Sequence, residues 1–410
     1  MSSLSHTQAS HLARRAGFSA QDSIVQTLLS TSSADSAVDA LISMPTTLSP
    51  LPDWHDSAPF GRSEDESQRQ ENKQMRNQWS RELKYWWFGQ MIANTSPLQE
   101  KMTLFWANHF TSSLKKVKWP PALLNQNRLL RTFALGSFRD MLKGILRDPA
   151  MLVYLDNANS NKGSPNENLA RELLELFTMG EGQYSEQDIK ELARALTGAS
   201  VNKKTGSYRF NRRAHDSGTK TIFGQTRAFT PDDIADLILA QPQVAPFITE
   251  KLWRFFVDDT PDMTVIDSIA LQFIQQDYDI ATALKALFTN EAFWVSQGVM
   301  LKSPMELIVG SVQLFDLPVI SQRRFLSVSR ALGQDLFNPP HVKGWAEGRA
   351  WYTTGTLATR EKVSQFVAAR HRIVPAEQQL LAVPTIVPLP QSTHRNYLNL
   401  LVNDPAYQVT

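Results

Sequence analysis

Glu172 and Glu175, two glutamates about one helical turn apart, are the residues whose type and spacing best fit chemistry. They interleave with Leu169, Leu173 and Leu176, whose spacing predicts an amphipathic helix that turns its leucines to the core. At about 100° per residue the carboxylates lie on the flank of that apolar face. Such a pair can hold a divalent metal between helices, or share a proton for acid–base work. The alternative is a solvent-facing helix with salt bridges, for which the same spacing is common.

His109 is the second candidate, because it shares the apolar face of a predicted helix with Met102 and Phe105. Imidazole is the commonest metal-binding side chain, so we take His109, Glu172 and Glu175 as candidate metal ligands for a divalent ion. The alternative is a buried histidine whose hydrogen bonds are satisfied within the core.

His215 and Asp216 form a third candidate in an irregular segment that follows a predicted hairpin. Functional side chains often lie on loops held by a rigid scaffold, and a carboxylate can fix the tautomer of a catalytic histidine. The candidate catalytic set is therefore Glu172, Glu175, His215 and Asp216. An ordinary turn pair is the alternative for His215 and Asp216.

Composition excludes several kinds of chemistry. The 410 residues contain no cysteine, which excludes disulfides, iron–sulfur clusters and cysteine nucleophiles. The net charge of +2 gives no reason to expect a nucleic-acid interface. The one tight basic cluster, Lys115, Lys116 and Lys118, reads as a solvated loop. The sequence also lacks the P-loop, GxGxxG, HExxH and GxSxG motifs, so nucleotide-dependent and common serine-hydrolase reactions lose support.

Helical periodicity and capping residues along most of the chain predict a mainly α fold, an irregular multi-helix domain spanning 1–373. Ser5 and Gly17 bound the first predicted helix, and Ser185 with Asp188 forms a capping box at a later one. A helix is expected over 165–177, and one small β-hairpin insertion at about 199–228. Residues 374–410 are predicted to be a proline-rich segment with a short terminal helix.

The sequence predicts neither a membrane span nor an export signal. No stretch reaches the roughly 18 consecutive apolar residues that a membrane helix needs. Arg14 and Arg15 resemble a twin-arginine signal, but Ser19, Gln21 and Asp22 follow where such a signal has apolar residues. We therefore expect a cytoplasmic protein, with export alongside a partner as the alternative.

Several long blocks occur in one order along the chain, at residues 11–18, 105–110, 148–157, 165–180, 193–198, 215–216, 302–304 and 339–345. On these blocks the sequence resembles the bacterial family Domain of Unknown Function 1800. The resemblance implies an α-helical fold without an assigned activity. It also implies a partner, because members are often encoded beside a protein similar to sulfatases and alkaline phosphatases.

Three functional hypotheses follow. The first is an enzyme with a carboxylate–histidine site, either hydrolytic or metal-dependent. The second is a non-catalytic partner of the sulfatase-like protein, for which an exposed patch near Trp345 and Trp351 would be evidence. The third is a carbohydrate- or cell-wall-binding module, suggested by the number of tryptophans in the sequence.

Overall fold

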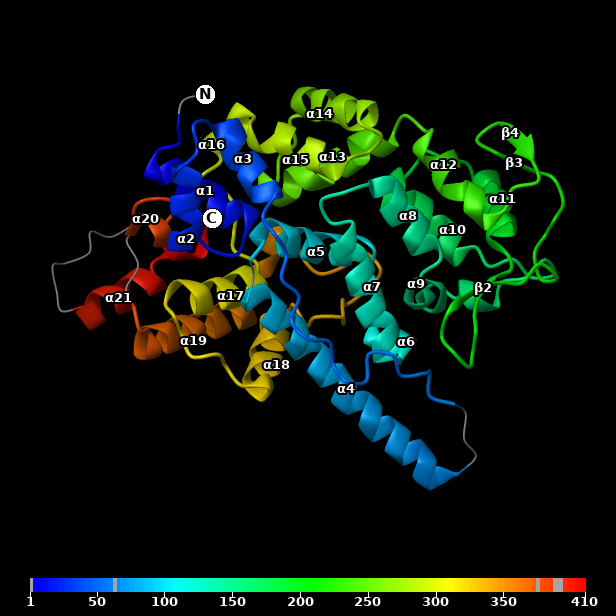
Figure 1. Cartoon of the computed structure of the whole chain (residues 1–410), viewed down its shortest axis with the longest axis horizontal. Coiled ribbons are helices and arrows are strands. Elements are labelled where there is room, and N and C mark those ends of the chain that lie inside the picture. The colour runs from blue at the N-terminus through cyan, green and yellow to red at the C-terminus, as the bar shows by residue number, and fades with distance from the viewer. Residues whose placement is uncertain (1–2, 62–64, 94, 374–376, 386–393) are drawn as a thin grey trace.

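The computed structural model describes residues 3–61, 65–93, 95–373, 377–385 and 394–410, and confirms the mainly α fold (Figure 1). The N-terminal helices are α1 (His6–Ala16), α2 (Asp22–Leu29), α3 (Ala34–Ile42) and α4 (Glu66–Ile92). The central helices are α5 (Pro97–His109), α6 (Leu114–Val117), α7 (Pro120–Thr132), α8 (Phe138–Leu146) and α9 (Pro149–Tyr154). Among the described residues, no helix combines the length and apolarity needed to cross a bilayer.

The second half begins with α10 (Asn168–Glu172) and α11 (Glu186–Leu196), followed by α12 (Ile234–Leu239), α13 (Val244–Phe256), α14 (Met263–Gln275), α15 (Ile280–Phe288) and α16 (Glu291–Val295). The C-terminal helices are α17 (Pro304–Leu314), α18 (Gln322–Ala331), α19 (Thr354–Arg370), α20 (Glu377–Leu380) and α21 (His394–Asn403). Of the predicted proline-rich segment, residues 374–376 and 386–393 lie outside the described residues.

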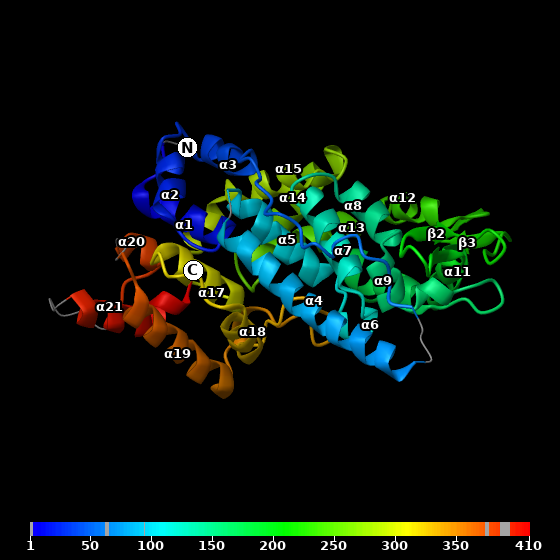
Figure 2. The same ribbon diagram turned by 60° about the horizontal axis from the view of Figure 1, so that its bottom comes forward.

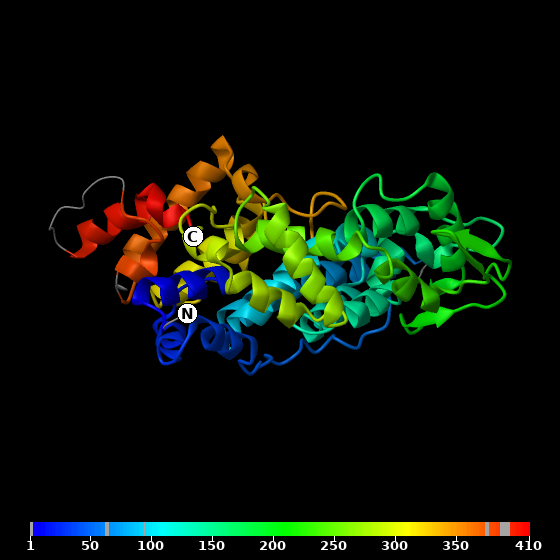
Figure 3. The same cartoon turned by 90° about the horizontal axis from the view of Figure 1, so that it is seen from above.

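Among the residues that the structure describes, the β structure consists of two hairpins where one was predicted. Strands β1 (Ala199–Val201) and β2 (Tyr208–Phe210) pair antiparallel, and so do β3 (Lys220–Ile222) and β4 (Gln225–Arg227). The hairpins lie beside α11 at one end of the long axis, and α21 lies at the other end (Figure 3).

The predicted helix over 165–177 is shorter and changes type along its length. It begins at Asn168 and continues from Leu173 to Thr178 as a π-helix, η2. The Met179 backbone N–H donates to the Leu174 carbonyl at 2.9 Å, across the five-residue spacing of this helix type. π-Helical turns are frequent at functional sites, and this one carries Glu175.

Buried apolar side chains form two clusters, and α5 contributes to both. Leu98, Met102 and Trp106 point into a cluster shared with α1–α3 and α8–α16. Leu104, on another face of the same helix, packs with α4, α17–α19 and α21. Helix α5 runs through the middle of the molecule (Figure 2) and contributes to both clusters. The side chains at its C-terminal end therefore lie where the two clusters meet.

Candidate functional site

Glu172 and Glu175 lie half-buried at the junction of α10 and η2. The Tyr184 hydroxyl donates to Glu175 Oε2 at 3.2 Å. Burial, and then the charge of Glu175, raise the pKa of Glu172, while the cations of Lys343 and Arg171 oppose the rise. The pair thus stands close enough to interact, and the pKa shift has the direction that an acid–base role requires.

His109 ends α5 and is buried among the rings of Phe105, Trp106 and Phe110. Its Nε2 donates to the carbonyl of Phe177 at 2.9 Å, and burial lowers the pKa of the imidazole well below its ordinary range. His109 is therefore a neutral side chain that ties α5 to the end of the π-helix.

The assignment of His109, Glu172 and Glu175 as metal ligands stays a prediction. In the part of the chain that the structure describes, no group of three or more His, Cys, Asp or Glu side chains is placed to hold a metal ion. A role for Glu172 and Glu175 in catalysis stays a prediction.

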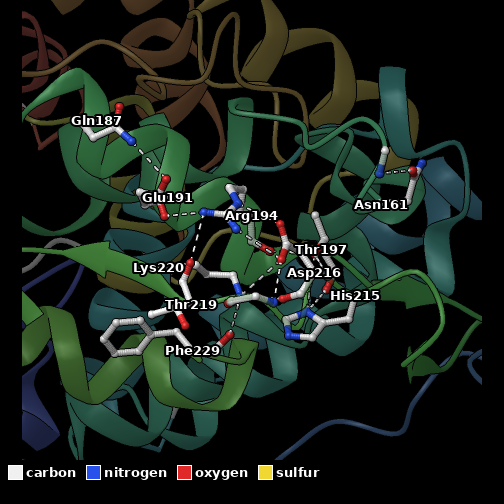
Figure 4. Close-up of polar contacts among 12 residues, drawn as sticks. Asn161, Gln187, Glu191, Arg194, Thr197, His215, Asp216, Thr219, Lys220 and Phe229 are labelled. Atoms are coloured by element: carbon white, nitrogen blue, oxygen red, sulfur yellow. Dashed lines mark hydrogen bonds and ion pairs between the residues drawn. The ribbon is translucent and has the colours of Figure 1, made fainter. Parts of the chain in front are cut away.

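His215 and Asp216 lie in the segment between β2 and β3, and both hydrogen-bond to Thr197 at the end of α11 (Figure 4). His215 Nδ1 donates to the Thr197 carbonyl at 2.9 Å, so this carbonyl orients the imidazole. Asp216 Oδ2 accepts from Arg194 Nε at 2.8 Å, and this bond holds the pKa of Asp216 below its ordinary value. The buried Lys220 ammonium donates to the Asp216 carbonyl as well. These contacts anchor the hairpin region to α11.

A charged cleft of about 50 Å³ lies where α1, α5 and α13 meet the segments around 300–306 and 346–351. We call it the central cleft. Its charged lining residues are Arg15, Lys101, Arg254, Glu306 and Glu347. Asn108 and Ser303 also line it, so three of the sequence blocks that define the family resemblance (11–18, 105–110 and 302–304) meet here.

Glu306 is ionised in the central cleft. The Lys101 ammonium donates to its Oε1, and the Ser303 backbone N–H donates to its Oε2 at 2.6 Å. Burial opposes ionisation, but the charge of Lys101 and these hydrogen bonds outweigh it and lower the pKa of Glu306. The pair is a buried ion pair that fixes the Lys101 ammonium at the cleft.

The pKa of Glu347, in the same cleft, shifts in the opposite direction to that of Glu306. Glu347 is an exposed residue, but the surrounding protein desolvates its carboxyl group and so raises the pKa of Glu347, although Lys251, Arg254 and a hydrogen bond from Asn108 oppose the rise. Asn108 Nδ2 donates to Glu347 Oε1 at 3.0 Å, and Asn108 Oδ1 accepts from the Trp345 backbone N–H at 2.6 Å. Asn108 thus holds the loop 345–347 in the position that places Glu347 at the cleft.

Arg15 provides a buried cation at the other wall. One guanidinium nitrogen donates to the Phe256 carbonyl at 2.9 Å and another to the Ser296 carbonyl. Among the described residues its Nε has no partner, and burial lowers the pKa of Arg15 to about 9. A buried guanidinium N–H without an acceptor is a site where an anion would bind favourably.

The sequence motifs had not singled out this cleft. Ser303 and Glu306 do match the S-x-x-E capping box, which α17 uses, but a capping box by itself indicates only a helix start. Trp345 and Trp351 are 4% and 6% exposed, so neither forms an exposed aromatic patch. The sulfatase-like partner and the carbohydrate-binding hypothesis stay predictions.

These features define a mainly helical protein with a charged cleft between two hydrophobic clusters. The chain belongs to the family described as Protein of unknown function (DUF1800), whose sequence profile matches residues 11–409. Neither a curated protein nor a solved structure matches the chain.

Proposed function

We propose that the protein is a hydrolytic enzyme that acts on a small anionic substrate in the central cleft, with Glu347 as the proton donor. The observation that carries the proposal is that three cations and two carboxyl groups line one cleft, and the surroundings of the two carboxyl groups shift their pKa values in opposite directions. When the surroundings of two carboxyl groups move their pKa values apart, the group with the raised pKa is the candidate acid and the other is the candidate base or ionised partner.

The cations of the cleft support an anionic substrate. Arg15, Lys101 and Arg254 reach the same space from α1, α5 and α13. A space of about 50 Å³ suits a carboxylate- or phosphate-sized group, with the rest of the substrate outside. Guanidinium and ammonium donors make the strong, charge-assisted hydrogen bonds that such groups accept.

In the proposed reaction Glu347 gives its proton to the leaving oxygen of an ester as the bond to that oxygen breaks. Water adds its hydroxyl to the acyl or phosphoryl centre, and the remaining water proton returns to the Glu347 carboxylate. Glu306 stays ionised and holds Lys101, so that the cation is in place before the substrate arrives.

The test is hydrolysis of two anionic esters whose phenol leaving group needs protonation, phenyl phosphate and monophenyl succinate, by the wild-type chain and two variants. Glu347→Gln keeps an oxygen for the hydrogen bond from Asn108 but has no proton to donate. We expect it to lose about 100-fold or more of kcat. Glu361→Gln, an exposed site on α19, is the matched control and should stay within about twofold.

Either of two results overturns the proposal. One is a wild-type chain that turns over neither ester. The other is a Glu347→Gln variant, folded by circular dichroism, that retains the wild-type rate.

A further inference from the structure

A second pocket, of about 520 Å³, is lined by residues of α4, of the α6 region and of α18. In Figure 1, α6 and α18 lie on either side of α4. Its lining is strongly basic and we call it the basic pocket. The six cations are Arg76, Arg81, Lys84, Lys115, Lys118 and Arg330.

The positive charge of this pocket is largely uncompensated. Asp335 pairs with Lys84 and lies 3.7 Å from Arg330 Nε. Among the described residues, no carboxylate forms an ion pair with any of the other four cations. Six cations therefore face one carboxylate, although the whole chain has a net charge of only +2. Such a concentration favours an anionic ligand.

The fold fixes the ammonium of Lys84 and the backbone of Lys118 at this pocket. Lys84 is 4% exposed on α4, and burial lowers the pKa of its ammonium even though Asp335 opposes the shift. The charges of Arg330 and Lys115 act in the same direction as burial. Lys118 ends α6 in the left-handed region at φ 55°, a conformation that non-glycine residues adopt rarely. A phosphate oxyanion would offset the repulsion among these cations.

We propose that the basic pocket binds a small ligand that carries two or more phosphate groups. The volume lies in the range of small-molecule sites, and several separate cations can each meet a different phosphate. Leu114 and Leu326 are the apolar lining residues, and no aromatic ring is among the described residues that line the pocket. Recognition therefore depends on charge and not on stacking of a base, which disfavours single-stranded nucleic acid.

The proposal does not depend on the central cleft. Its test is isothermal titration calorimetry with inorganic tripolyphosphate as the probe, on the full chain at low salt. We expect the wild type to bind it, and the double variant Arg81→Gln/Lys115→Gln to bind it at least about tenfold more weakly, because each removed cation takes away a charge-assisted contact. Both residues are exposed, so the variant should fold.

The matched control is Arg323→Gln/Lys203→Gln, which removes the same number of exposed cations away from the pocket. It should bind as the wild type does. No binding by the wild type, or an equal loss in the control, would overturn the proposal. A single-stranded oligonucleotide that binds more tightly than tripolyphosphate, with the same dependence on Arg81 and Lys115, would overturn it in favour of a nucleic-acid site.

Discussion

Asp148→Asn should change the pH dependence of stability more than any surface substitution. Asp148 precedes α9 and caps it, because its Oδ2 accepts from the Met151 backbone N–H at 2.8 Å. Gln126 Nε2 donates to the same oxygen at 2.8 Å. Burial raises the pKa of Asp148 to about 7, although these hydrogen bonds oppose the rise. Asparagine keeps an acceptor oxygen for the cap and has no charge to bury.

The magnitude follows from linkage between protonation and folding. Between its ordinary pKa of 3.8 and about 7, the folded state binds a proton at Asp148 that the unfolded state has released. The stability from this group is fully present below pH 3.8 and is lost as pH rises through the window. At about 1.4 kcal/mol per pH unit, the wild type should lose roughly 2.5 kcal/mol from this group between pH 5 and 8.

The assay is urea unfolding of the wild type and of Asp148→Asn at pH 5, 6, 7 and 8. The free energy of unfolding of the variant relative to wild type should rise by roughly 2.5 kcal/mol over that range. A relative stability that does not change with pH would refute the claim that burial raises the pKa of Asp148.

Asp188→Asn is the control, because the pKa of Asp188 is shifted in the opposite direction to that of Asp148. Burial opposes its ionisation, but hydrogen bonds from Ser185 and from the Phe223 backbone N–H lower the pKa of Asp188. Its contribution is lost only as pH falls through that lowered pKa, so the effect of this substitution should be constant between pH 5 and 8.

Three further variants test other buried groups by chemical unfolding. Burial lowers the pKa of Lys302 to about 7, so wild-type stability rises with pH from about 7 upward, and the gain from Lys302→Met should shrink by roughly 2.5 kcal/mol between pH 6 and 9. In the wild type the buried Arg131 guanidinium lies 3.0 Å from Glu100 Oε2. Glu100→Gln removes this counter-charge and should lower the free energy of unfolding by about 3 kcal/mol. Gly344→Ala should cost more than about 1 kcal/mol, because φ is +95° and a Cβ would lie 2.3 Å from Asn108 Oδ1.

Each of these three variants has a matched control substitution at an exposed or uncrowded position. Lys203→Met and Glu361→Gln remove exposed charges, and Gly355→Ala adds a Cβ that meets nothing within 4 Å. A pH-independent effect of Lys302→Met, or losses in Glu100→Gln and Gly344→Ala no larger than in these controls, would contradict the contacts described above.

Local sequence signals predicted much of the helical structure. Ser5 caps α1 and Gly17 ends it, and Ser185 with Asp188 forms the capping box of α11. These signals succeed because cap residues satisfy backbone groups within the same few residues. Ser19 shows the limit of such reasoning, because with Asp22 three residues later it matches a capping box and predicts that a helix begins there. Its hydroxyl donates to Gln313 Oε1 at 2.7 Å, and α2 begins later, at Asp22.

Both clefts depend on contacts that no local pattern reveals. Lys115 and Lys118 alone predicted only a solvated loop. Arg76 and Arg330, which complete the basic pocket, come from segments far away in the sequence, so no local pattern could show that the four cations meet. The π-helix that carries Glu175 contacts His109 through the Phe177 carbonyl, and the leucine spacing does not distinguish this helix from an α-helix.

The most direct test of the central cleft is a carbon-13 NMR titration of its two glutamate carboxyl groups, with the signals assigned from Glu347→Gln and Glu306→Gln. We predict a midpoint above the ordinary 4.5 for Glu347 and below it for Glu306. Midpoints on the same side of 4.5, or in the reverse order, would contradict the assignment of Glu347 as the proton donor.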